Sequence, residues 1–257
     1  MKKSFGFLKL RFRYLCRKAG ISKFQIHQVC LAKHKLIYIP LPKNACTSIK
    51  QALHEIEFGK PFDSTLDEFR MYDEIHDYYL KRPNAFTGKK ELETLAGYNR
   101  FTVVRDPVKR LLSCYRNRVL DSGDLNESKK TLHRKGLFVQ PDLDSFIMNL
   151  DQYRKFSSKI EHHSRSQSAF LDGSLRYLDK IYRMKDLGQL FDLLKKQKRG
   201  LAIRQRKTGG TEVGLENLSE EAFEKLLEFY RDDYKLLKEY YSEESIRQKY
   251  ESVKKRS

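Results

Sequence analysis

The sequence predicts an α/β protein whose central, mostly parallel sheet is flanked by helices. Two segments, about sixty residues apart, lead to this prediction, because each runs from a short apolar strand through a polar turn into an amphipathic helix. The third observation is size, since 257 residues, 39% of them hydrophobic, can bury one sizeable core. We therefore expect a single domain over residues 1–257, with a basic N-terminal segment at 1–34 and a C-terminal helix at 219–241.

The first segment predicts an anion-binding loop. Its strand at Leu36–Ile39 is β-branched and aromatic, and two prolines follow. Apolar residues at helical spacing resume at Ile49, so we expect a helix that begins near Thr47 or Ser48. The loop carries Lys43, and the helix dipole, the Lys43 ammonium and the following backbone N–H groups would face a bound phosphate. These N–H groups belong to Asn44, Ala45, Cys46, Thr47 and Ser48.

Strand, lysine-bearing turn and helix in this order make the predicted three-layer fold P-loop-like. The glycines of the G-x-x-x-x-G-K-[ST] loop are missing here, so a basic turn without a ligand is the alternative interpretation.

The second segment predicts a second phosphate contact. Its strand at 101–104 is followed by Asp106, a good N-cap residue, and by Pro107 at the first helical position. Arg105 leaves the strand at its C-terminal end, where α/β folds bind ligands. The Arg105 guanidinium and the Ser113 hydroxyl could hold one phosphate together, the arginine through a charge-assisted pair. The alternative is a structural arginine beside a solvated helix face.

These two segments resemble a known family. The loop Pro-Lys-Asn-Ala-Cys-Thr-Ser at 42–48 is similar to the 5′-phosphosulfate loop of carbohydrate sulfotransferases, and residues 104–116 are similar to their 3′-phosphate motif. The likeness is to the chondroitin and dermatan branch. It implies that 3′-phosphoadenosine 5′-phosphosulfate (PAPS) is the donor and that its sulfuryl group passes to a hydroxyl or amine of a carbohydrate acceptor.

Two further stretches resemble elements of the same branch. His-Ser-Arg-Ser-Gln at 163–167 looks like its His-x-x-Pro-Gln element, with Ser166 in place of the proline. Arg-Met-Lys-Asp-Leu at 183–187 looks like its Arg-x-Glu-x-Leu segment, with Asp186, one position later, as the counterpart of the glutamate. The second likeness implies a donor contact by Arg183.

The late basic loop at 204–210 carries Arg206 and Lys207. It resembles in composition a loop that closes over the nucleotide in many sulfotransferases. The alternative is a solvated turn before the C-terminal helix.

Sulfuryl transfer is dominated by positioning and by charge stabilisation, as phosphoryl transfer is. We expect Lys43 to stabilise the leaving oxygens, and we expect no metal. The acceptor hydroxyl needs a general base, and His76, on an expected helix over 66–82, is the first choice. His163 is its rival. The alternative for His76 is a histidine packed in the core, and the alternative for His163 is a histidine that tethers a loop.

The net charge of +18 is unevenly distributed, because residues 1–50 contain twelve Lys or Arg and no Asp or Glu. Such a field could concentrate PAPS, and an acidic glycan acceptor would also use it. The amphipathic N-terminal segment is compatible both with peripheral contact to an anionic membrane and with packing on the domain. We expect no specific nucleic-acid partner.

The four cysteines show no C-x-x-C spacing, no signal peptide precedes them, and no stretch approaches a membrane span. Reduced thiols in a cytoplasmic protein are expected, or a Golgi-lumenal location if the chain has been trimmed of an anchor. Two other functions are weighed against sulfuryl transfer: a P-loop kinase or nucleotide hydrolase, and a non-enzymatic polyanion-binding protein.

Overall fold

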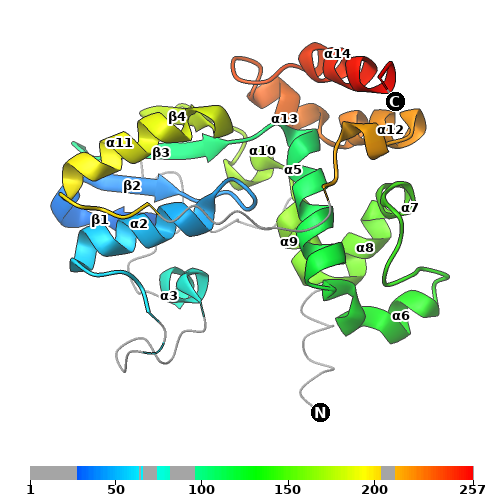
Figure 1. Cartoon of the computed structure of the whole chain (residues 1–257), viewed down its shortest axis with the longest axis horizontal. Helices are drawn as coiled ribbons and strands as arrows, with labels where there is room; N and C mark the ends of the chain where they lie inside the picture. The colour runs from blue at the N-terminus through cyan, green and yellow to red at the C-terminus, as the bar shows by residue number, and fades with distance from the viewer. Residues whose placement is uncertain (1–27, 64, 66–73, 82–95, 204–211, 257) are drawn as a thin grey trace. The chain divides into compact units, whose positions relative to one another are not determined.

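The computed structural model describes residues 28–63, 65, 74–81, 96–203 and 212–256. These residues form two compact units, each with its own hydrophobic core (Figure 1). The sheet unit takes its described residues from 28–105 and 167–203, and the helical unit takes its own from 106–166 and 212–256. The single domain over residues 1–257 stays a prediction, and the basic segment at 1–34 lies mostly outside the described residues.

The described sheet has four strands in the order β1-β2-β3-β4 (Figure 1). They are Val29–Leu31, Leu36–Ile39, Asn99–Val104 and Lys180–Arg183. β2, β3 and β4 run parallel, with Tyr38 opposite Phe101 and Phe101 opposite Lys180, whereas β1 pairs with β2 in antiparallel orientation. The predicted α/β fold with a mostly parallel sheet and flanking helices is thereby confirmed.

The sheet unit also contains four described helices. They are α2 (Cys46–Phe58), α3 (Ile75–Lys81), α10 (Gln167–Phe170) and α11 (Leu187–Gln197), with 3₁₀ turns at Ala32–His34 and Met184–Asp186. Apolar residues of α2, α3 and α11 share a core with Tyr38, Phe101 and Val103 of the strands. Ile37 and Ile39 point to the opposite side of β2 and are also buried, as expected for a central parallel strand.

The helical unit begins with α5 (Pro107–Cys114), which continues into a π-helical segment at Tyr115–Asp121. It goes on through Asp124–Ser128 (3₁₀), α6 (Lys129–His133), α7 (Leu143–Met148), α8 (Leu150–Phe156) and α9 (Ser158–Ser164). A 3₁₀ turn at Leu215–Asn217 and helices α12 (Glu220–Phe229), α13 (Arg231–Leu236) and α14 (Glu243–Lys254) complete it.

The start of α5 confirms the sequence prediction. The Asp106 carboxylate accepts a hydrogen bond from the Lys109 N–H at 3.1 Å, and Pro107 occupies the first helical turn. This pairing satisfies an N–H group that the helix itself cannot. Apolar residues at helical spacing along α5 and the π-helical segment are buried, namely Val108, Leu111, Leu112, Tyr115 and Val119.

Two helix boundaries differ from the prediction. α2 begins at Cys46, one residue before Thr47, because Ala45 adopts a left-handed conformation and turns the chain into the helix directly. The expected helix at 219–241 is two helices, α12 and α13. They are separated at Tyr230, whose φ of −104° and ψ of 18° depart from helical values.

Of the expected helix at 66–82, the described residues contain α3, which carries His76 as predicted. Residues 66–73 and the basic loop with Arg206 and Lys207 lie outside the described residues.

Candidate functional site

The loop between β2 and α2 has an unusual backbone. Lys43 has a φ of 68° and Ala45 a φ of 58°, so two residues with side chains adopt the left-handed conformation, with only Asn44 between them. This conformation costs about 1–2 kcal/mol for each such residue. Alternation of left- and right-handed residues turns successive N–H groups toward one point, which is a common anion-binding arrangement. Strain of this kind often accompanies a functional site.

The N-terminus of α2 continues the same arrangement. Ala45, the N-cap residue, has no polar side chain with which to cap the helix. The first N–H groups of a 13-residue helix, with its positive dipole end, therefore follow directly on the strained loop. Such a helix start is suited to a phosphate or sulfate group.

Asn44 holds the loop onto the sheet. Its side chain is fully buried, and its Nδ2 atom donates to the Val103 carbonyl and to Gln167 Oε1, both at 2.8 Å. Its own N–H donates to the Leu41 carbonyl at 3.3 Å. The loop conformation is therefore fixed by contacts to β3 and α10, and not by the loop sequence alone.

Gln167, the first residue of α10, joins the two predicted phosphate segments. Besides the bond from Asn44, its Oε1 atom accepts a hydrogen bond from the Arg105 N–H at 3.1 Å. Its Nε2 atom donates to the Arg105 carbonyl at 2.7 Å. The sequence predicted no role for Gln167. It lies 123 positions from Asn44 in the chain, and local sequence patterns cannot reveal a contact over that distance.

Arg105 lies beside the loop, as the sequence predicted from its position at the end of β3. One of its guanidinium nitrogens donates to the Lys43 carbonyl at 3.1 Å, and its side chain is half-buried. The structure thus brings together two predicted donor-binding residues, Lys43 and Arg105, which are 62 positions apart in the chain.

His76 contacts the first turns of α2. Its Nε2 atom is 2.8 Å from Thr47 Oγ1, and its Nδ1 atom is 3.2 Å from Lys50 Nζ. Lys50 is 7% exposed, and burial lowers the pKa of its ammonium group. His76 therefore lies next to the predicted anion-binding loop, on α3.

Other predicted site residues lie elsewhere. Arg183, at the end of β4, forms a 2.7 Å ion pair with Asp186, its partner within the same short turn. Ser113 lies half-buried on α5 and His163 half-buried on α9, both in the helical unit. Their roles stay predictions.

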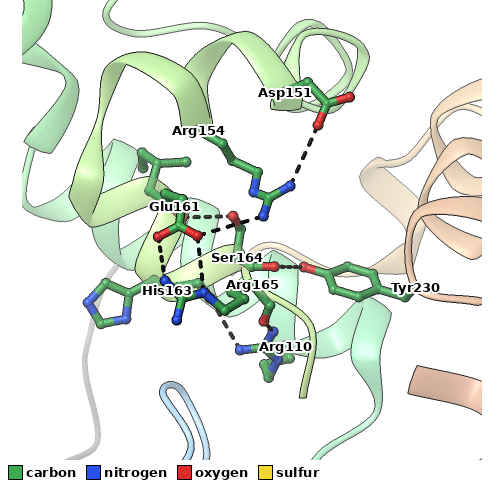
Figure 2. A network of polar contacts seen from close by, with 9 residues as sticks. Arg110, Asp151, Arg154, Glu161, His163, Ser164, Arg165 and Tyr230 are labelled. Carbon is green, nitrogen blue, oxygen red and sulfur yellow. Dashed lines mark hydrogen bonds and ion pairs between the residues drawn. The ribbon is translucent and has the colours of Figure 1, made fainter. Parts of the chain in front are cut away.

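The residues next to His163 form a polar network in the helical unit (Figure 2). The fully buried Arg110 donates to the carbonyls of His163, at 3.3 Å, and Arg165, and the Tyr230 hydroxyl donates to the Ser164 carbonyl at 2.6 Å. These bonds satisfy carbonyls at the C-terminal end of α9. Figure 2 shows the His163 imidazole turned away from Arg110.

Glu161 extends this network. Its carboxylate accepts two hydrogen bonds from Arg165, at 3.0 and 2.7 Å, and lies 3.9 Å from Arg154, which also faces Asp151 (Figure 2). The backbone at His163 is thus fixed by its neighbours on both sides.

Within the described residues no group of three or more His, Cys, Asp or Glu could hold a metal ion. Cys30, Cys46 and Cys114 form no disulfide among the described residues, and Cys16 lies outside them. Among the helices that the structure describes, none has both the length and the apolar character needed to cross a bilayer.

The mostly parallel sheet leads into a strained, lysine-bearing loop and a helix N-terminus, with Arg105 beside the loop. In an α/β protein this arrangement is suited to a phosphate or sulfate group. Comparison with family models then gives the family. The model described as "Sulfotransferase family" matches residues 27–242, and the chain belongs to this family. A comparison with curated proteins and one with solved structures found no match. Membership supports an enzyme of sulfuryl transfer, for which PAPS is the general donor.

Proposed function

We propose that this protein transfers the sulfuryl group of PAPS in line to a hydroxyl or amine of a carbohydrate acceptor, without a metal. The observation that carries the proposal is the strained loop at Lys43 and Ala45, fixed by Asn44 and Gln167 beside Arg105. A backbone held in this costly conformation at a helix start is suited to an anion.

The residues present fit the two anionic ends of PAPS. Main-chain N–H groups of the loop and the Lys43 ammonium would hold the 5′-phosphosulfate, and the Arg105 guanidinium would hold the 3′-phosphate. When bound, PAPS supplies an activated sulfuryl group. Further donor contacts by Ser113, Arg183, Arg206 and Lys207 rest on the sequence analysis alone.

Lys43 is the residue proposed to promote the reaction itself. Its ammonium would stabilise the charge that grows on the leaving oxygens as the acceptor oxygen attacks, an interaction stronger in the transition state than in the ground state. The acceptor proton passes to a general base, for which His76 and His163 are the two candidates.

The acceptor class rests on the resemblance to the chondroitin and dermatan branch and on charge. The net charge of +18 favours an acidic glycan over a neutral one. A cytoplasmic location and a peripheral membrane contact through the basic N-terminal segment are part of the same proposal.

The first experiment separates catalysis by Lys43 from donor binding. Transfer of radioactive sulfate from labelled PAPS to acidic and neutral glycans is measured for the wild-type protein and for Lys43→Ala. Lys43→Ala should lower kcat by more than it weakens binding of the product 3′-phosphoadenosine 5′-phosphate (PAP), because the lost interaction belongs to the transition state.

Lys33→Ala is the matched control, because Lys33 is an exposed lysine of the same unit, on the turn at Ala32–His34. This variant should keep wild-type turnover. Retained kcat with only a raised KM in Lys43→Ala would contradict the catalytic role. Phosphate transfer from ATP with Mg²⁺, in place of sulfate transfer, would select the kinase alternative.

A further inference from the structure

The imidazole of His76 is held between two polar groups of α2. Thr47 and Lys50 are three residues apart on this helix, so their side chains lie on one face. That face contacts His76 from α3, with Thr47 Oγ1 at 2.8 Å from Nε2 and Lys50 Nζ at 3.2 Å from Nδ1. Both ring nitrogens therefore lie within hydrogen-bond distance of a specific partner.

The chemistry of these partners decides which nitrogen carries the proton. A lysine ammonium can only donate hydrogen bonds, so Nδ1 of His76 must accept the bond from Lys50. A neutral imidazole that accepts at Nδ1 carries its proton on Nε2. The Nε2–H group then donates to Thr47 Oγ1.

This arrangement gives the Thr47 hydroxyl a defined direction. Because its oxygen accepts a hydrogen bond from His76, its own proton is directed to another acceptor. Thr47 is the second residue of α2, directly after the strained loop, where the helix N–H groups would meet an anion.

We propose that His76 is a positioning residue, whose tautomer is set by Lys50 so that the Thr47 hydroxyl donates its proton to the anionic sulfate donor at the loop. The inference rests on the proposed function in one respect, namely that the donor binds at this loop. The proposal gives Lys50 a role in the site, which is to set the tautomer of His76. It also differs from the expectation that His76 is the general base, since a base needs an unprotonated nitrogen that faces the acceptor hydroxyl.

The first test reads the tautomer in the full chain without ligand. Long-range ¹H–¹⁵N correlation spectra distinguish protonated from unprotonated ring nitrogens, and the signal lost in His76→Gln identifies His76. At neutral pH the Nε2-protonated tautomer is expected. In Lys50→Met, which removes the ammonium but keeps most of the length of the side chain, this preference should be lost. A Nδ1-protonated ring in the wild-type protein, or an unchanged spectrum in Lys50→Met, would overturn the proposal.

The second test uses two substitutions at His76. Gln keeps an N–H group that can reach Thr47 but cannot act as a base, whereas Ala removes both functions. His76→Gln should keep kcat and PAP affinity within about tenfold of wild type, whereas His76→Ala should lose clearly more. A general base would instead show a loss of about 10²- to 10⁴-fold in kcat for both variants, which would refute a positioning role.

A double-mutant cycle tests whether His76 acts through Thr47. If it does, Thr47→Val should weaken PAP binding in the wild-type protein but add little in His76→Ala. Full additivity of the two substitutions would contradict the relay. His54→Gln is the matched control, because His54 is a buried histidine of α2 whose Nδ1 is hydrogen-bonded to the Lys60 carbonyl. It should alter the melting temperature without changing PAP affinity.

Failure of the proposed function gives a different pattern. If the wild-type protein binds no PAP, the donor assignment is wrong, and with it the direction of the Thr47 proton. The tautomer spectra of the wild-type protein and Lys50→Met would still decide whether Lys50, His76 and Thr47 form the relay.

Discussion

The side chain of Asn44 shows how one buried amide can set a functional backbone. Its two donor bonds, to the Val103 carbonyl and to Gln167, connect the strained loop to β3 and α10. Lys43 and Ala45 on either side adopt the left-handed conformation that the loop requires. The cost of that conformation is offset by contacts of this kind, since a strained backbone persists only where its surroundings determine it.

Asn44→Ala should therefore reduce both stability and donor binding. The substitution removes the amide that donates to the Val103 carbonyl, and both residues are fully buried. Loss of such a bond costs about 1–3 kcal/mol of unfolding free energy. Urea denaturation followed by circular dichroism measures the loss, and PAP binding should weaken in parallel. Asn99→Ala, at an exposed position at the start of β3, is the control and should change little. Equal stability of the two variants would mean that the Asn44 bonds do not hold the loop.

Single residues also mark the limit of what the sequence could predict. Lys43 and Arg105 were predicted because each belongs to a contiguous strand, turn and helix pattern. Gln167 received no role, because its bonds to Asn44 and Arg105 span 123 and 62 positions, and no local pattern encodes them. The contact of His76 with Lys50 and Thr47 was missed for the same reason, since it joins two helices.

At the scale of elements, the helix caps explain why some helix boundaries could be predicted from the sequence and others could not. Asp106 caps α5 as expected, because a carboxylate before a proline is a strong local signal. α2 starts earlier than its good N-cap residues Thr47 and Ser48 suggest, because the tertiary contacts of the loop place Ala45 in the left-handed region. The break between α12 and α13 at Tyr230 was likewise hidden, since an apolar stripe continues through it.

The Asp106 cap predicts a characteristic pH dependence. Burial raises the pKa of the Asp106 carboxyl above its ordinary value of 3.8, although the Lys109 N–H acts in the opposite direction. The native state therefore holds this proton more tightly than the unfolded state, and the contribution of Asp106 to stability decreases as pH rises above 3.8. Asp106→Asn keeps the cap without the titration. Relative to this variant, the wild-type protein should lose unfolding free energy as pH rises from about 4, until the native carboxyl is ionised.

Asp142 provides a control of opposite sign. It caps α7, and hydrogen bonds from the Ser145 N–H and hydroxyl lower the pKa of its carboxyl. Relative to Asp142→Asn, the wild-type protein should gain stability as pH rises toward 3.8. Urea denaturation at a series of pH values measures both pairs. The same slope for the two aspartates would contradict the assigned effect of burial on Asp106.

At the scale of the whole molecule, the predicted site residues are distributed over two units. The sheet unit contains the strained loop, Arg105, Gln167 and the His76 contacts, and the helical unit contains Ser113 and His163. The α/β fold could be predicted because strand and helix periodicities are local, and the family match over residues 27–242 agrees with it. The particular acceptor sugar and the position sulfated could not be predicted, because no motif in the sequence encodes them.

The net charge of +18 also acts at this scale. A strongly basic protein attracts any polyanion, so weak binding of an anionic nucleotide is not in itself a sign of a donor site. The donor site differs from this general attraction in its geometry, since Arg105 should recognise a 3′-phosphate specifically. Two nucleotides that differ only in that phosphate also differ in charge, so the comparison needs two arginine variants that lower the net charge of the protein equally.

The most direct test is calorimetric titration of the full chain with PAP and with 5′-AMP at physiological salt. PAP should bind at least about tenfold more tightly, because a charge-assisted hydrogen bond in such a site is worth about 1.5–3 kcal/mol. Arg105→Gln should abolish this difference. Arg100→Gln, which removes an arginine within β3 and its ion pair with Asp179, should preserve it. Equal affinity of the wild-type protein for PAP and 5′-AMP would contradict the assignment of this loop and Arg105 to the sulfate donor.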